Sequence, residues 1–327
     1  MNNKISIAQL QALIIIAALG FEILIMPMVI SSTFELCFII IAGFLLCLLA
    51  VNSDINIQGN KLLCFIYSVK NILVAVLLIR ILTDVVKDVL LNDILIYQII
   101  FIIVLSAGYS AWKGIEAIAR ISQMLFWFVV IGTIYIYLMA VPDIDLGNFA
   151  GDFYFKNIIK SCLFGFVMNT AEIIILIKSY LKRESKRAIK AVILSFLLVF
   201  AITLVIIGKI GINGMKRVEY PLFEIMYTAN LPNVFIKRQE GIFIALWIIS
   251  ALVSVFIYFG TTVSFMEHMN IKKKSATIML MIFTFALVLF YNGTKAVRTY
   301  CFLQILGGII TAFVIPLIYI FRRNKIE

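Results

Sequence analysis

The feature that most constrains this chain is a series of long apolar segments that recurs along its 327 residues. Ten segments are predicted, with boundaries at 7–28, 34–51, 62–83, 94–112, 118–140, 157–178, 188–208, 240–263, 275–291 and 299–321. Each is close to the roughly 20 residues that an α-helix needs to cross a bilayer. Because each run is continuous and does not alternate, the pattern predicts membrane-spanning helices and excludes the strands of a β-barrel.

Composition supports a membrane protein that is not an enzyme. Hydrophobic residues make up 63% of the chain and charged residues 14%, whereas soluble domains are about half apolar and about a quarter charged. The net charge of +11 is assigned to cytoplasmic loops and not to nucleic-acid binding, because no basic stripe alternates with exposed aromatic residues. His268 is the only histidine, and the chain contains no H-E-x-x-H, G-x-S-x-G or G-x-x-x-x-G-K-[ST] motif. No metal, cofactor or catalytic residue is therefore expected.

The basic residues predict the orientation of the spans. An even number of spans places both termini on one side, and with both inside, sixteen of the 28 Lys and Arg fall in inner segments and ten in outer segments. Lys70 and Arg80 lie within the third segment, and five of the outer ten belong to the long loop 209–239. The excess predicts cytoplasmic N- and C-termini. Within that loop, Pro221 to Tyr227 is expected to form a short helix on the outer face or a surface linker.

Ten spans divide into two halves of five, and an odd number of spans inverts the second half relative to the first. The pattern therefore predicts an all-α, LeuT-like inverted repeat with halves at about 5–140 and 155–321, in a single polytopic domain covering residues 1–327. In that plan helices 1 and 6 are broken at the middle of the membrane. The ligand site is expected between them.

Both predicted breaks contain small or polar residues. The candidate ligand-binding residues are Gly20, Phe21, Glu22, Phe164, Gly165, Phe166, Asn169 and Thr170. Unwound backbone at the two glycines would leave carbonyl and amide groups for a ligand, since such groups must be satisfied inside a membrane. The alternatives are that Glu22 makes a structural hydrogen bond to a neighbouring helix and that Gly165 only permits a close helix contact.

Charged residues within or beside the spans form a second group of candidates. Glu22, Lys70 and Glu172 are candidates for charge balance or ion coupling, because a charge inside a span costs about 2.5–3.5 kcal/mol on insertion scales. Lys70 could neutralise either acid or take the place of a metal cation, and simple charge pairing would also explain it. Glu116 and Arg120 are spaced i,i+4 and are expected to pair at the inner boundary, either as a gate or as a charge-neutral turn.

At these residues the chain resembles the spore germination permease family, the GerAB-type B subunits of nutrient germinant receptors. The most distinctive similarity is the stretch 109–120, which reads Tyr-Ser-Ala-Trp-Lys-Gly-Ile-Glu-Ala-Ile-Ala-Arg. Weaker similarities are the opening 5–10 followed by Gly20 and Pro27, the outer-loop residues 219–222 with 238–241 and Trp247, and the basic tail after Pro316. The sixth segment departs from the family's F-x-G-x-E pattern, because Gly165-Phe-Val-Met-Asn169 precedes Glu172.

The resemblance implies a fold related to amino acid/polyamine/organocation transporters. It also implies a role in sensing an amino acid or similar nutrient in the inner membrane of a bacterial endospore, beside A- and C-type receptor subunits. The expected function is nutrient binding that helps to trigger germination. The alternatives are a proton- or sodium-coupled amino-acid transporter, and an ion channel or structural subunit.

Overall fold

The computed structural model describes residues 5–53, 55–91, 93–149, 155–181, 188–228, 239–291 and 296–323. In this part of the chain every regular element is a helix. Ten stretches are long and apolar enough to cross a membrane, and we number them spans 1 to 10: Ile7–Val29, Thr33–Asn52, Lys61–Val89, Ile96–Lys113, Ile115–Asp143, Asn157–Lys178, Ile189–Ile210, Gly241–His268, Lys273–Phe290 and Ala296–Phe321. The predicted ten-span architecture is confirmed, with most boundaries within a few residues.

Spans 1, 6 and 10 are each built from more than one helical element. Span 1 contains α1 (Ile7–Ala17), the π-helical segment η1 (Ala18–Glu22) and α2 (Ile23–Val29). Span 6 contains α7 (Phe155–Phe164), the 3₁₀ segment η4 (Gly165–Val167) and α8 (Thr170–Lys178). Span 10 contains α14 (Ala296–Gly308), the π-helical segment η7 (Ile309–Val314) and α15 (Ile315–Arg323).

Each of the remaining spans contains one α-helix, which in span 5 is continued by a 3₁₀ turn. These helices are α3 (Thr33–Asn52), α4 (Lys61–Val89), α5 (Ile96–Lys113), α6 (Ile115–Ala140, continued by the 3₁₀ turn η2, Val141–Asp143), α9 (Ile189–Ile210), α12 (Gln239–His268) and α13 (Lys273–Phe290). Three short elements lie between spans: η3 (Leu146–Phe149), α10 (Ile212–Met215) and α11 (Pro221–Thr228). The last of these confirms the predicted short helix at Pro221.

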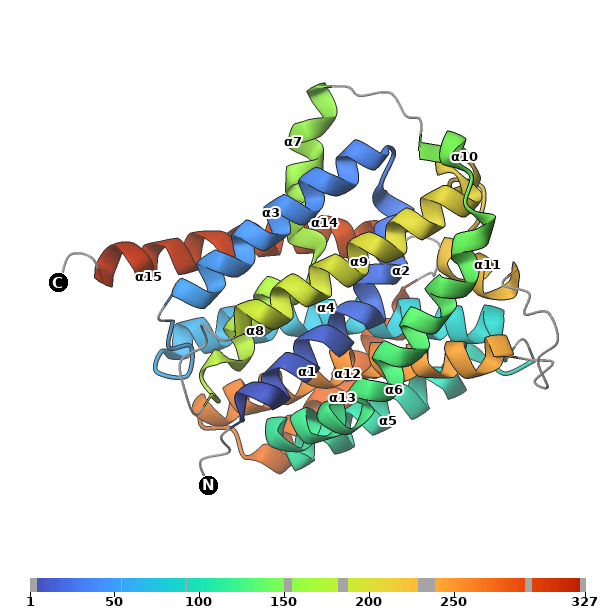
Figure 1. The fold of residues 1–327 in the computed structure, drawn as a ribbon. Helices are drawn as coiled ribbons and strands as arrows, with labels where there is room; N and C mark the ends of the chain where they lie inside the picture. The colour runs from blue at the N-terminus through green and yellow to red at the C-terminus, as the bar shows by residue number, and fades with distance from the viewer. Residues whose placement is uncertain are drawn as a thin grey trace.

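Span 1 is the central element of the bundle. Its α1 packs against α6, α9 and α12, and η1 packs against α9 and α12; Figure 1 shows α1 running between α9 and α6. It is also the most completely buried of the ten spans, whereas span 5 is the least buried. The buried polar groups of span 1, such as the side chain of Glu22, must therefore find their partners on other spans.

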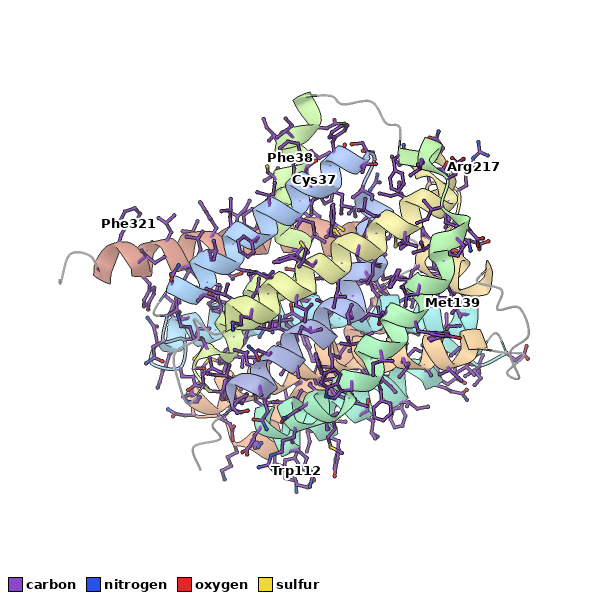
Figure 2. The ribbon with its side chains drawn as sticks, viewed as in Figure 1. Cys37, Phe38, Trp112, Met139, Arg217 and Phe321 are labelled. Atoms are coloured by element: carbon purple, nitrogen blue, oxygen red, sulfur yellow. The ribbon has the colours of Figure 1, made fainter. Side chains whose placement is uncertain are left out.

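The periphery of the bundle is apolar. Large exposed side chains such as Trp112 and Phe321 point away from the core, at the end of α5 and on α15 (Figure 2). This is the reverse of a soluble surface and fits contact with lipid. The first turn of α1 and the last turn of α15 are both drawn on the left of Figure 1, as an even number of spans requires. Figure 1 also shows α7 and α15 projecting from the rest of the bundle.

Spans 1, 2 and 6 are tied together at one end of the bundle. The backbone N–H of Ile5 donates to the carbonyl of Tyr180 at 2.8 Å, within an isolated β-bridge between Ile5 and Leu181. Lys178, the last residue of α8, donates from Nζ to the carbonyl of Ser53, which follows the end of α3. These contacts fix the position of the N-terminal end of span 1 relative to the C-terminal end of span 6.

Some of the predicted features lie outside the described residues. They include the inner basic residues Lys4, Lys182, Arg183, Lys186 and Arg187, the outer basic residues Lys237, Arg238 and Lys295, and Lys325 of the basic tail.

Candidate functional site

The backbone of span 6 is interrupted, as predicted. After Phe164 the chain forms a 3₁₀ turn, Met168 is extended (φ −71°, ψ 117°), and a new α-helix starts at Thr170. Gly165 lies directly against α3, since a Cβ added there would be 2.7 Å from the Cβ of Ala42. The same glycine therefore begins the break and permits a close helix contact.

Span 1 differs in form from the predicted interruption. Its backbone stays helical and widens into the π-helical turn η1, where the sequence predicted unwound backbone at Gly20. The carbonyl of Gly20 accepts a 2.6 Å hydrogen bond from Nε1 of Trp247 on α12. A Cβ on Gly20 would lie 2.7 Å from the carbonyl oxygen of Ser250, so α12 touches the backbone itself. This packing holds the segment in a wide turn and satisfies the carbonyl without unwinding.

Glu22, at the end of η1, connects span 1 to the break in span 6. Its Oε1 accepts hydrogen bonds from the backbone N–H of Thr170 at 3.0 Å and from its hydroxyl at 2.7 Å. Because Thr170 is the first residue of α8, the carboxylate lies at a helix N-terminus, where negative charge is stabilised. The other oxygen, Oε2, is buried and accepts no hydrogen bond from the described residues.

Glu172 makes the second connection, through a buried ion pair. Its Oε1 lies 2.8 Å from Nζ of Lys70, and the two side chains are only 4% and 7% exposed. The hydroxyl of Tyr258 donates to Oε2 of Glu172 at 3.4 Å, and Lys70 also donates to the hydroxyl of Thr311 at 2.9 Å. Lys70 therefore neutralises Glu172, and none of the described basic side chains forms an ion pair with Glu22.

Asn169 makes the third connection, to span 10. Its Oδ1 accepts from the hydroxyl of Tyr300 and from Nε2 of Gln304, both at 2.6 Å. Residues 169–172 thus reach spans 1, 3, 8 and 10 within one turn of helix. We call the following nine residues the polar cluster: Glu22, Lys70, Asn169, Thr170, Glu172, Tyr258, Tyr300, Gln304 and Thr311.

The three predicted phenylalanines lie beside the two helix irregularities. Phe21 is fully buried and meets Trp247 edge to face, with ring centroids 6.5 Å apart. Phe223 of α11 also meets Trp247 edge to face, with ring centroids 5.0 Å apart, so these three rings join η1 to the short helix outside the spans.

In span 6, Phe166 packs edge to face on Phe313 of span 10, with centroids 6.5 Å apart. The ammonium of Lys160 lies 5.5 Å from the ring centroid of Phe164. Both rings are half-buried. Both rings therefore lie beside the break in span 6.

The predicted Glu116–Arg120 pair forms, but away from these connections. The two side chains are 2.5 Å apart in the first turns of α6, and Arg120 is largely exposed. A single residue, Gly114, joins α5 to α6 with a positive φ of 97° that favours glycine. Among the described residues, no hydrogen bond links this pair to the polar cluster.

Four members of the polar cluster were not predicted from the sequence: Tyr258, Tyr300, Gln304 and Thr311. All four carry no formal charge and lie outside the two predicted breaks. A usable signal was present, because Gln304 and Thr311 are polar residues two helical turns apart in an apolar segment. Tyrosine gives a weaker signal, since it is also common at membrane interfaces.

The chain matches known proteins over most of its length. The sequence model of the family described as "Spore germination protein" matches residues 4–297, which include all of the polar cluster except Tyr300, Gln304 and Thr311. Spore germination protein YndE of Bacillus subtilis (strain 168) is 25% identical over 190 residues, which is 55% of this chain and 52% of YndE. The chain thus aligns with about half the length of this relative. The extent of the family match shows that the chain belongs to the spore germination permease family.

Proposed function

We propose that this membrane protein is a transporter-like subunit of a spore germinant receptor, and that it binds an amino acid or a similar small amine between spans 1 and 6. The observation that carries the proposal is the state of Glu22. One carboxylate oxygen is held by Thr170, and the other is buried without a described partner. A buried charge is costly unless it is paired. A ligand ammonium group would supply the missing partner.

The fold we propose for this function is the LeuT-like inverted repeat, with halves at about 5–140 and 155–321. Two observations support it. The irregular segments η1 and η4 fall in the first span of each half, and Glu22 links them through Thr170. Gly20, Phe21, Gly165 and the polar cluster would then surround the ligand, with Phe164 and Phe166 as its walls.

Germination would be triggered by a shift between two conformations. Glu22 and residues 169–172 connect five spans, so a ligand that binds among them changes how those spans pack. The ligand must bind one conformation more tightly than the other, because otherwise it shifts nothing. We propose that A- and C-type receptor subunits in the spore inner membrane bind the two conformations differently and so respond to the shift between them. The excess of inner basic residues supports cytoplasmic termini.

The replacement Glu22→Gln tests the binding role. Glutamine can keep the hydrogen bonds from Thr170 through its amide oxygen, but it removes the negative charge that would pair with an ammonium group. We expect the nutrient concentration for half-maximal germination to rise about tenfold or more, which corresponds to ~1.4 kcal/mol or more of binding free energy. The measurement is a dose–response curve of spore germination, with protein abundance followed by immunoblot.

Glu267→Gln is the matched control, since Glu267 is exposed at the end of α12. It is expected to leave the dose–response curve unchanged. A thermal-shift screen of the purified protein against amino acids tests binding without the receptor, because a ligand at 100 times its Kd stabilises by about 2.7 kcal/mol. An unchanged response for Glu22→Gln would remove Glu22 from the site.

A coupled transporter is the second candidate, and one observation favours it. Ser68 and Asn71 lie one turn apart on α4, and Ser68 Oγ and Asn71 Oδ1 are both buried without a described hydrogen-bond partner. Oxygen atoms so placed within a span are suited to a sodium ion or a proton-carrying water, and the ionisable Lys70 lies between these two residues in α4. Gradient-driven uptake of labelled amino acid by proteoliposomes containing this chain alone would favour the transporter.

Glu116 and Arg120 remain our candidates for a gate, next to the one-residue joint at Gly114. An exposed ion pair contributes about 0–1 kcal/mol to stability, so Arg120→Gln is expected to change the thermal stability of the protein very little. If the pair gates movement of α6 against α5, the same variant will still shift the germination dose–response curve. A variant with wild-type stability and a wild-type response would leave the charge-neutral turn as the explanation.

A further inference from the structure

A groove on the membrane-facing side of the bundle is not used by the proposed function. It is lined by the first three turns of α1, the third and fourth turns of α6 and the first two turns of α9, and its volume is about 380 Å³. The helices α6 and α9 both pack along α1, with little contact between each other, so α1 forms the floor of the groove. The residues that line it are Ala8, Gln11, Ala12, Ile15, Gln123, Phe126, Trp127, Lys190, Ala191 and Leu194.

The groove is polar at one end and apolar at the other. Gln11 and Lys190 lie in the first two turns of α1 and α9, and Gln123 lies in the third turn of α6. One turn further along each helix, the lining changes to Ile15, Trp127 and Leu194. This order of groups follows the order in a phospholipid, from charged headgroup to acyl chain.

Two further features favour a lipid over a peptide or a second helix. Trp127 lines the groove about halfway along span 5 and is 66% exposed, so its indole faces the acyl chains of the bilayer. Lys190 is exposed in the first turn of α9, whose N-terminal amides have no side-chain cap, so both the ammonium and the helix end attract negative charge. Basic pockets between spans bind anionic headgroups, and the charge at this one is positive.

We propose that this groove is a binding site for a single anionic phospholipid. Lys190 contacts the phosphate region, and Gln11 and Gln123 flank the headgroup. One acyl chain lies over α1 between α6 and α9. Because α1 continues directly into η1, the lipid stabilises the element that carries Glu22, further along the same span.

Quenching of Trp127 fluorescence by lipids with brominated acyl chains tests the proposal. The chain has three tryptophans, and Trp247 is only 4% exposed, so Trp112→Phe leaves Trp127 as the one indole that lipid can reach. This protein is reconstituted in phosphatidylcholine vesicles with increasing fractions of brominated phosphatidylglycerol or brominated phosphatidylcholine. We expect half-maximal quenching at an about fivefold lower fraction of the glycerol lipid, the preference that one basic residue supplies.

Variants at Lys190 distinguish a bound lipid from ordinary surrounding lipid. Lys190→Gln in the same background is expected to remove the preference, and Lys190→Arg to keep it. Lys274→Gln is the matched control, since Lys274 is an exposed lysine in the first turn of α13 and does not line the groove; it should behave like the parent. Equal quenching by the two lipids in the parent protein, or an unchanged preference in Lys190→Gln, would overturn the proposal.

Discussion

Replacing Lys70 by methionine is expected to destabilise the protein by about 3–5 kcal/mol, because it leaves the carboxylate of Glu172 buried without its cation. The two groups are 2.8 Å apart, and both side chains are almost completely excluded from solvent. Tyr258 remains as a hydrogen-bond donor at 3.4 Å, which is too long to compensate a full charge. Thermal unfolding in detergent, with the yield of folded protein after size exclusion, measures the effect.

The double variant Lys70→Met with Glu172→Leu separates pairing from packing. Removing both charges together leaves no unpaired ion, and apolar replacements for buried pairs are often neutral or stabilising. We therefore expect the double variant to recover most of the stability that Lys70→Met loses. If the two single replacements are each mild and their effects add, the groups are not coupled and the ion pair does not hold spans 3 and 6 together.

The second large effect is expected for Gly20→Ala. A Cβ at this position would lie 2.7 Å from the carbonyl oxygen of Ser250 and 2.8 Å from the amide nitrogen of Ala251. Both are backbone atoms of α12, so the clash can be relieved only by moving the helix. Overpacking of this kind costs about 1–3 kcal/mol, which exceeds the ~1 kcal/mol that alanine gains over glycine in a helix. We expect a lower unfolding temperature and a weakened Trp247 hydrogen bond to the carbonyl of residue 20.

Gly241→Ala is the matched control for this prediction. Gly241 is also in a helix, but no atom lies within 4 Å of the added Cβ. Alanine there should be neutral or slightly stabilising, because only the intrinsic helix preference remains. Trp247 fluorescence provides a local readout, since its indole nitrogen lies 2.6 Å from the Gly20 carbonyl. Equal stabilities for the two variants would show that the packing of α12 does not require a residue without a side chain at position 20.

The span count and most boundaries could be predicted from the sequence because they depend on local composition. A helix of about 20 consecutive apolar residues is stable in a bilayer whatever its tertiary partners are, so each of the ten segments could be recognised separately. The break in span 6 was also visible, since small and polar residues gather at Gly165, Asn169 and Thr170. The i,i+4 pairing of Glu116 with Arg120 follows from helix geometry alone.

The partners within the membrane depended on the tertiary structure. The sequence left open whether Lys70 balances Glu22 or Glu172, and the folded structure pairs it with Glu172. Likewise, the predicted unwinding at Gly20 became a π turn, because Trp247, 227 residues away, satisfies the carbonyl. Tyr300 and Gln304 entered the site only because span 10 packs against the break in span 6.

Sequence alone therefore determined that this chain forms ten apolar helices, and that two of them are irregular near Gly20 and Gly165. It also determined which acidic side chains need partners inside the bundle. Tertiary structure decided which acid is paired and which is not. The physical reason is that hydropathy acts on each segment separately, whereas a buried charge is compensated only by atoms that packing brings within about 3 Å. That difference leaves Glu22, held by Thr170 through one oxygen, as the group on which the proposed nutrient site depends.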